Sequence, residues 1–454
     1  MFRRVLWIAM LLVWLTGCVD ASVPPQIDPN VGASQPPALA NAASQAQDPI
    51  ANSAPAEINP PAQSTVTGQT VVANEPTVSS GIVVSNETVL LTPTAEATAT
   101  AAATADAAPQ QGGAINPLTG LAVKDPATLA LSPALVSITN FPVSARPQAG
   151  LSFSPFVFEM YVGEGMTRFL ALFYGDYPVK GDDPSMALAD DRIGPVRSGR
   201  LPYESLRMLY SGFLIMASAS PNVKAVMGTY TNVFGTDDTD INSALIPATR
   251  LAEIANKNPK RLGPDALSAL TFSDSLPTGG KAGQSVWIPY SYLNQVFWRY
   301  DSPSGAYHRY QDNADAVTFT QTTDRLNGDP LTYENVVVLF ADHQAKAETL
   351  IDIDLLYIKR MAALLFRDGQ MYEIYWTTAN EAYERSTGLV RPIRFVDAQG
   401  NPFPLKPGQT WVEIVQAYTP YNETIESETY FDLKHKISPG SGNWAIQFMA
   451  TTPE

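Results

Sequence analysis

The sequence predicts an α+β protein in which the second half of the chain is nearly all strand. Short runs rich in β-branched and aromatic residues, such as Ala134–Thr139 and Asn335–Phe340, recur between turn residues. Helical spacing of apolar residues is confined to the first half, where Ile246–Asn256 places Leu251 and Ile254 on one face. After about residue 280 the regular segments fit strands and hairpins.

Local signals set the expected elements of the first half. Gly163-Glu164-Gly165 is a tight turn between two apolar runs, and Pro202 suits the first turn of a helix. The expected strands are 134–139, 156–162, 168–174 and 213–217, and the expected helices are 202–210, 246–256 and 264–270.

The second half reads as a series of strands. Asp301–Gly305 and Asp368-Gly369 are turn signals between apolar runs, so each predicts a hairpin. The expected strands are 285–289, 297–300, 307–310, 335–340, 363–366, 371–376 and 411–415.

The N-terminus reads as an export signal. Arg3 and Arg4 precede the uncharged apolar run Val5–Leu15, which is too short to span a bilayer comfortably. The following Leu15-Thr16-Gly17-Cys18 is similar to a bacterial lipobox, and Cys18 is the single cysteine of the chain. These features predict lipidation of Cys18 with acyl chains such as palmitate, and a protein held at the extracytoplasmic face of the cell membrane. The alternative is an ordinary membrane anchor with an incidental cysteine.

Residues 19–112 are expected to form a disordered stalk. They are rich in Ala, Pro, Ser and Thr and contain eight acids but no Lys or Arg. Such a segment cannot bury enough apolar surface to offset the entropy of ordering it. The chain thus divides into a signal peptide (1–18), the stalk (19–112), an α+β domain (113–280) and a β-rich domain (281–454).

Composition excludes several classes of function. The net charge of −15 argues against nucleic-acid binding, which needs clustered cations. One cysteine and three histidines, His308, His343 and His435, leave little room for a metal centre. Motifs of nucleophilic, nucleotide-binding or zinc-dependent enzymes are absent from the sequence. We therefore predict no cofactor, no metal and no assignable catalytic residue.

Two stretches of the chain resemble the YerB-like lipoproteins, a bacterial family of unknown function (the DUF3048 family). The first spans about 116–223 and contains Ala145–Leu151 (ARPQAGL), Gly165–Phe169 (GMTRF) and Ile193–Arg200 (IGPVRSGR). The second spans about 297–415 and contains Pro407–Ile414 (PGQTWVEI). The resemblance implies a layered β-β-α sandwich and an envelope lipoprotein, but it supplies no known reaction.

The chain departs from the family pattern at two places. Thr139 stands before Asn140 where the family tends to have an acid, and Ala217–Pro221 (ASASP) stands where it often reads HAGGSP. A site that used this acid and this histidine would be altered here. The segment 179–191 is also an insertion.

A polar cluster around Ile193–Arg200 carries the best candidate site. Three arginines near one another could hold a carboxylate or phosphate through bidentate hydrogen bonds. The candidate ligand-binding residues are Arg168, Arg197, Arg200 and Glu164. The alternative is that the arginines pair with Glu159, Glu164 and Asp191 and only hold the loop in place.

Two functions follow from these patterns. The first is a non-catalytic module that binds a cell-wall polymer or an envelope protein. The second is a hydrolase or transferase acting on an envelope glycan, with Glu159 or Glu164 as proton donor in a cleft that raises its pKa. A third reading is a purely structural spacer. The aromatic residues between Trp287 and Tyr310 could line a sugar or peptide groove, although cross-strand packing is the commoner use of such a set.

Overall fold

The computed structural model describes residues 113–178, 190–257, 267–425 and 436–453. The signal peptide, Cys18, the stalk and most of the insertion at 179–191 lie outside these residues, as does part of the expected helix at 264–270. In the described part of the chain, no helix is long and apolar enough to cross a membrane.

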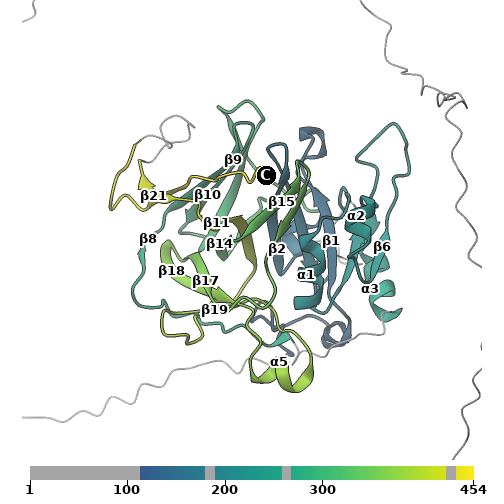
Figure 1. Ribbon diagram of the computed structural model, residues 1–454, viewed down its shortest axis with the longest axis horizontal. Helices are drawn as coiled ribbons and strands as arrows, with labels where there is room; N and C mark the ends of the chain where they lie inside the picture. Colours follow the sequence, from purple (N-terminus) through teal and green to yellow (C-terminus); the bar gives the residue numbers. More distant parts are fainter. Residues whose placement is uncertain (1–112, 179–189, 258–266, 426–435, 454) are drawn as a thin grey trace, which may run out of the picture. The chain divides into compact units, whose positions relative to one another are not determined.

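The larger of two main β-sheets has eleven strands and draws on both halves of the chain (Figure 1). Its order is β19-β18-β17-β14-β20-β2-β3-β1-β5-β6, with β8 paired to β18. The strands from the first half are β1 (Ala134–Thr139), β2 (Phe156–Gly163), β3 (Met166–Phe173), β5 (Phe213–Met216) and β6 (Tyr230–Asn232). Those from the second half are β8 (Lys281–Ala282), β14 (Asn335–Ala341), β17 (Met361–Arg367), β18 (Gln370–Thr377), β19 (Arg394–Val396) and β20 (Thr410–Gln416). The boundary near residue 280 stays a prediction, and strands from both sides of it share this sheet.

The smaller sheet has seven strands in the order β12-β11-β10-β9-β22-β21, with β13 paired to β11. Its members are β9 (Ser285–Ser291), β10 (Asn294–Asp301), β11 (Ala306–Asp312), β12 (Phe319–Gln321), β13 (Thr332–Tyr333), β21 (Tyr421–Thr424) and β22 (Asn443–Ile446). The C-terminal segment therefore packs on the body, because β22 pairs in parallel with β9. Two short pairs complete the strands: β15 (His343–Ala347) with β16 (Leu350–Ile353), and β4 (Arg192–Ile193) with β7 (Ile246–Pro247).

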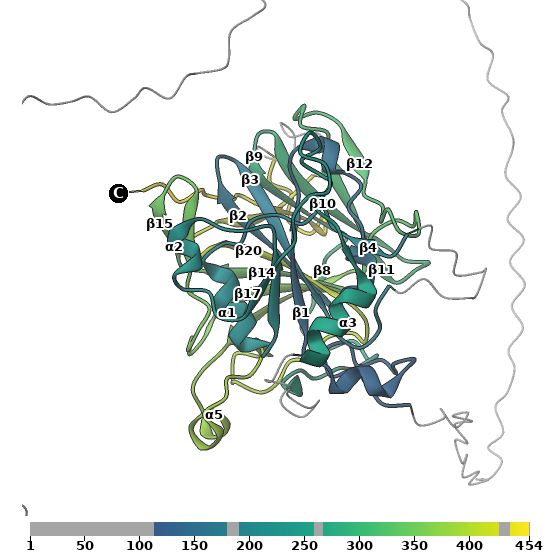
Figure 2. The same cartoon turned by 90° about the vertical axis from the view of Figure 1, so that its right-hand side faces the viewer.

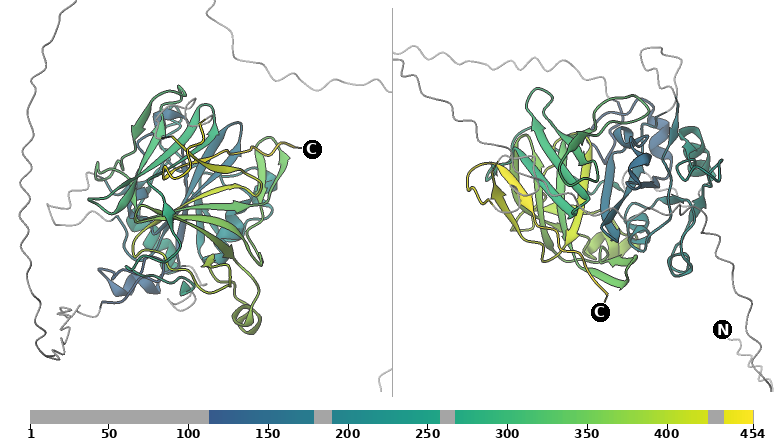
Figure 3. Two further views of the ribbon diagram at one scale, coloured as in Figure 1. Left: turned by 90° about the vertical axis from the view of Figure 1, so that its left-hand side faces the viewer. Right: turned by 90° about the horizontal axis from the view of Figure 1, so that it is seen from above.

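The two main sheets face each other across an aromatic core. Trp298 of β10 lies 5.3 Å from Trp411 of β20 between ring centroids, and both side chains are fully buried. Tyr333 and Phe169 pack edge-on against Trp411 at 5.2 and 5.1 Å. Figure 3 shows the two sheets from above.

Helices cover the opposite face of the large sheet. Tyr210, at the end of α1 (Pro202–Leu209), packs on Phe156 and Phe158 of β2, whereas Glu159 of β2 points to the other sheet. The other helices are α2 (Pro221–Lys224), α3 (Ala248–Lys257) and α5 (Ala382–Thr387). Figure 2 shows α1 and α3 to the left and right of β1. The strand-rich character of the fold is confirmed, whereas the layered β-β-α sandwich as a fold class stays a prediction.

The turn between β2 and β3 requires glycine. Gly163 has φ +100°, and a Cβ added there would lie 2.0 Å from the carbonyl oxygen of Glu348. Gly388, after α5, has φ +69° with nothing within 4 Å of its added Cβ. Gly163→Ala should therefore destabilise the protein by about 3 kcal/mol or more, and Gly388→Ala by only about 1 kcal/mol. Urea denaturation followed by tryptophan fluorescence measures both, and equal losses would contradict the predicted clash.

Candidate functional site

The candidate site lies where two parallel strands end side by side. β1 and β5 are neighbours in the large sheet and run in parallel. In the sheet order β2-β3-β1-β5-β6, the strand that follows β1 in the chain, β2, lies on one side of the β1–β5 pair. The strand that follows β5, β6, lies on the opposite side of this pair. The carboxyl ends of β1 and β5 thus form a topological switch point, the position at which open α/β sheets commonly bind ligands.

The segment after β4 lies across this switch point and is hydrogen-bonded to both strands. The Arg197 N–H donates to the carbonyl of Ser137 at 2.9 Å, and the Ala217 N–H donates to the carbonyl of Arg197 at 2.9 Å. Gly199 fits closely, because an added Cβ would lie 2.4 Å from the sulfur of Met216. The Ile193–Arg200 motif is therefore held as a third strand-like segment between the ends of β1 and β5.

Arg168 of β3 reaches the same place from the neighbouring strand. It is the cross-strand partner of Thr139, the last residue of β1. Its Nη1 donates to the carbonyl of Ser198 at 3.0 Å, on the helix-covered face of the sheet. The next residue, Phe169, packs on Trp411 on the other face. Arg168 and Phe169 thus point to opposite faces of the sheet, as alternation along a strand requires.

Electrostatics show that Arg168, Arg197 and Arg200 form one cluster of positive charge, the arginine cluster. Burial, and then repulsion by Arg200 and Arg197, lowers the pKa of Arg168 to about 10. Burial also lowers the pKa of Arg197, partly offset by attraction to Asp240. Within the described ranges none of the three arginines forms an ion pair with an acid.

Much of the hydrogen-bonding capacity of the cluster is unused. A guanidinium has five N–H donors. The Nε atoms of Arg168 and Arg200 are both buried and have no acceptor in the part of the chain that the structure describes. Among the described residues, the Arg200 side chain donates only to the adjacent carbonyl of Gly199, at 3.1 Å. Because buried donors cost free energy when they lack an acceptor, the cluster is suited to an anion supplied from outside.

The structure thus brings only some of the predicted site residues together. Arg168, Arg197 and Arg200 come together, but Glu164 lies apart from them, exposed in the β2–β3 turn with φ +54°. The alternative pairing of the arginines with Glu159, Glu164 and Asp191 is not formed, since Glu159 pairs with Arg309 instead. Both departures from the family pattern, Thr139-Asn140 and Ala217–Pro221, lie at the carboxyl ends of β1 and β5, and the Asn140 amide donates to Thr167 at 2.9 Å.

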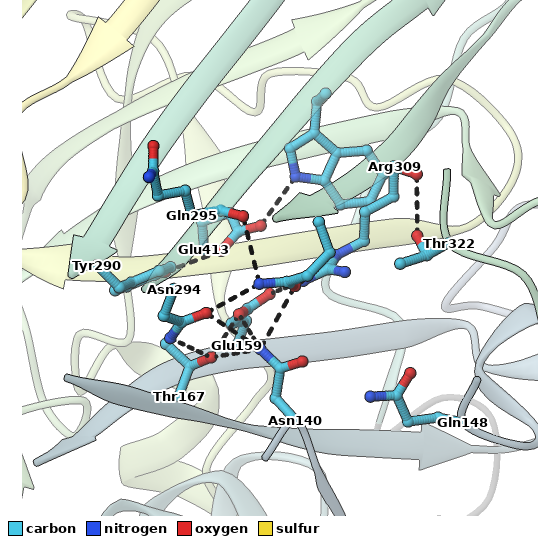
Figure 4. Close-up of polar contacts among 12 residues, drawn as sticks. Asn140, Gln148, Glu159, Thr167, Tyr290, Asn294, Gln295, Arg309, Thr322 and Glu413 are labelled. Atoms are coloured by element: carbon cyan, nitrogen blue, oxygen red, sulfur yellow. Dashed lines mark hydrogen bonds and ion pairs between the residues drawn. The ribbon is translucent and has the colours of Figure 1, made fainter. Parts of the chain in front are cut away.

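A second polar group, which was not predicted from the sequence, is buried between the two main sheets (Figure 4). Arg309 of β11 is ion-paired with Glu159 of β2 at 2.8 Å between Nη2 and Oε2. Glu413 of β20 accepts from Trp298 Nε1 and from the hydroxyl of Tyr290, each at 2.8 Å. The side chains of Glu159, Arg309 and Glu413, the buried triad, are at most 1% exposed.

The buried triad contains two carboxylates and one cation. Burial, and then repulsion by Glu159, raises the pKa of Glu413 to about 8 despite the attraction of Arg309. Thr167 donates to Glu159 at 2.7 Å, so Glu159 keeps a hydroxyl donor as well as the arginine. The sequence does contain a signal for this group. A Glu inside a run of apolar strand residues, as in Trp-Val-Glu-Ile at 411–414, indicates a buried carboxyl that needs polar partners.

The buried triad gives no support to a proton donor for a glycan. Glu159 has no exposed surface and is already ion-paired, while Glu164 lies in an exposed turn. The aromatic residues between β9 and β11 serve mainly as packing: Trp287, Trp298 and Tyr307 have no exposed surface. In contrast, Tyr292 is 56% exposed, in the turn between β9 and β10.

The order of motifs and the shared sheet indicate a family of two-part proteins without an assigned activity. The family model described as "Protein of unknown function (DUF3048) N-terminal domain" matches residues 118–259, and the C-terminal domain model matches residues 286–412. The chain belongs to this family.

Two comparisons extend this assignment. The chain is 27% identical over 315 residues to the Bacillus subtilis (strain 168) protein described as "Putative lipoprotein YerB", covering 66% of this chain and 85% of that protein. The crystal structure of YerB from Bacillus subtilis superposes with a TM-score of 0.52 at 26% identity, covering 66% of this chain and 96% of the other.

Proposed function

We propose that this chain is a lipid-anchored protein of the cell envelope that binds an anionic group of a cell-wall polymer or of an envelope protein. Lipid on Cys18 would hold it at the extracytoplasmic face of the membrane, and a layered β-β-α body would carry the binding site. The observation that carries the binding part is the arginine cluster, which has no paired acid in the described residues and contains two buried donors without acceptors. The position of the cluster at a switch point also favours ligand binding.

Anchoring is supported by the lipobox and by the lipoprotein name of the Bacillus relative. We expect the wild-type chain to incorporate labelled palmitate in a bacterial host and to remain with membranes after an alkaline wash. Cys18→Ser should abolish the label completely, because the thioether forms on sulfur, while the neighbouring change Ser22→Ala should leave it intact. Two or more acyl chains, at about 0.8 kcal/mol per methylene, suffice for stable anchoring. Full labelling of the Cys18 variant would contradict lipidation at this residue.

Anion binding is tested with the mature full-length chain and two envelope fractions, isolated cell wall and detergent-solubilised envelope proteins. We expect saturable binding to one of them, weakened at least about 30-fold by Arg168→Gln with Arg200→Gln, because each hydrogen bond to a charged group contributes roughly 1.5–3 kcal/mol. Arg385→Gln is the matched control, since Arg385 lies on α5 and its side chain bonds, within the described ranges, only to the carbonyl of Asn380. Equal binding by the double variant and the control would contradict the proposed site.

A further inference from the structure

Exposed apolar side chains stand beside the arginine cluster. Phe234 and Ile241, in the loop between β6 and β7, are 69% and 60% exposed, and Val143, after β1, is 38% exposed. We call these three residues the apolar rim. Large apolar side chains that gather beside a polar site mark an interaction surface more often than scattered ones do.

Hydrogen bonds connect the apolar rim to the arginine cluster. Arg197 Nη1 donates to the carbonyl of Ile241, and Arg197 Nη2 donates to Asn242 Oδ1 at 2.9 Å. The same Asn242 donates to the hydroxyl of Ser144 at 3.3 Å, which brings Val143 to this loop. On the other side, the Ser218 N–H bonds to Asn232, two residues before Phe234, and the Gly199 N–H bonds to Ser218. The rim and the arginines therefore form one surface at the ends of β1, β5 and β6. In Figure 1 the loop after β6 projects from the body near α2.

The charges of the same loop limit what this surface can accept. Asp237, Asp238 and Asp240 are all exposed between Phe234 and Ile241. They would repel a polymer with an anion on every repeat, and they would repel an anionic membrane surface in the same way. A ligand with a single anionic group placed among the arginines avoids this repulsion. The apolar rim then requires that the groups next to that anion be apolar.

We propose that the site binds a peptide segment of a partner protein that has one carboxylate flanked by apolar side chains. This inference rests on the proposed anion-binding function and names its ligand class. The carboxylate meets the half-buried guanidinium groups of Arg168 and Arg200, while the flanking side chains pack on Phe234 and Ile241. Arg197 has a positioning role, because its hydrogen bonds hold the β6–β7 loop, which carries Phe234 and Ile241.

The test uses three probes with the mature full-length chain. The first is a pool of nine-residue peptides with a central Asp or Glu between Leu, Ile, Val and Phe. The second is the same pool with a central Asn or Gln, and the third is vesicles of phosphatidylglycerol, with inorganic phosphate as a competitor. We expect binding of the acidic pool, reduced at least about tenfold by the amide replacement.

Three variants separate the contributions. Phe234→Ser with Ile241→Ser should weaken peptide binding about tenfold or more, because apolar area is lost without loss of charge. Tyr418→Ser, a 76% exposed aromatic residue elsewhere, is the matched control. Thr139→Asp should also abolish peptide binding. It places a carboxylate directly across the strand pair from Arg168, where it competes with the carboxylate of the peptide. Circular dichroism and denaturation midpoints check that each variant is folded.

The outcomes are distinguishable. If the acidic pool binds and both the rim variant and the amide pool lose binding, the inference is supported. If the cell-wall fraction binds through the arginines but no peptide does, the peptide inference is overturned and the proposed function stands. If only the vesicles bind, both are overturned. If no anionic probe or envelope fraction binds, both are overturned.

Discussion

Replacing Arg309 with methionine is expected to lower the free energy of unfolding by about 3–5 kcal/mol, because it leaves the carboxylate of Glu159 buried without its cation. Arg309 bonds to Glu159 at 2.8 Å and to Gln311 at 2.7 Å. Its guanidinium also lies 4.8 Å from the ring centroid of Trp411 and 5.2 Å from that of Phe169. The substitution thus removes a charge partner and a packing group from the interface between the two sheets.

The matched comparison is the double variant Glu159→Gln with Arg309→Met. It removes both charges, so it should recover a large part of the loss, since a buried ion pair replaced as a whole is often close to neutral. Urea denaturation of the mature chain at pH 7 measures both variants. A double variant as unstable as Arg309→Met alone would show that packing, and not the unpaired carboxylate, dominates. A loss below about 1 kcal/mol for Arg309→Met would contradict the role assigned to the pair.

Glu413 is expected to make the stability of the body fall as pH rises. Burial raises its pKa to about 8 in the folded protein from an ordinary value of 4.5. Between these values the folded state keeps a proton that the unfolded state releases, so this contribution to stability is complete below pH 4.5 and is lost as pH rises through 8. From pH 5 to pH 8 the loss should be on the order of 4 kcal/mol, at about 1.4 kcal/mol per pKa unit.

Glu413→Gln should remove this dependence while keeping the local geometry. The amide can accept from Trp298 and bond to Tyr290, and it carries no charge near Glu159 and Arg309, the charged groups that face Glu413. The measurement is the free energy of unfolding at steps between pH 5 and pH 8. The difference between Glu413→Gln and wild type should grow with pH, while Glu348→Gln, an exposed control, should follow wild type. Parallel profiles for Glu413→Gln and wild type would contradict the raised pKa.

The local elements of the fold were accessible from sequence because their signals are local. The predicted strand at 134–139 has the bounds of β1, and the predicted helix at 202–210 begins where α1 begins and ends one residue beyond it. The Gly163-Glu164-Gly165 turn joins β2 to β3 as its glycines indicate. In each case neighbouring residues within about ten positions carry the whole pattern.

The sheet order and the buried triad were not accessible in this way. β20 lies between β14 and β2, and it runs in parallel with both. The hydrophobic pattern of a strand does not identify the strand with which it pairs, because every buried strand shows a similar apolar run. Arg309 and Glu159 are 150 positions apart, and Glu413 and Trp298 are 115 apart. The arginine cluster was predictable because Arg197 and Arg200 share one motif and Arg168 belongs to another, but the rim beside it was not.

If the chain is exported as proposed, the position of β20 also sets an order of events during export. Residues 410–416 fill the space between β2 and β14, so the edges of those two strands stay open until nearly the whole chain is available. A polypeptide translocated from its N-terminus would therefore have two long, apolar, unpaired strand edges, and such edges favour pairing with other chains. If Cys18 is lipidated early, the lipid holds the incomplete sheet at the membrane until β20 has been translocated and can pair with β2 and β14.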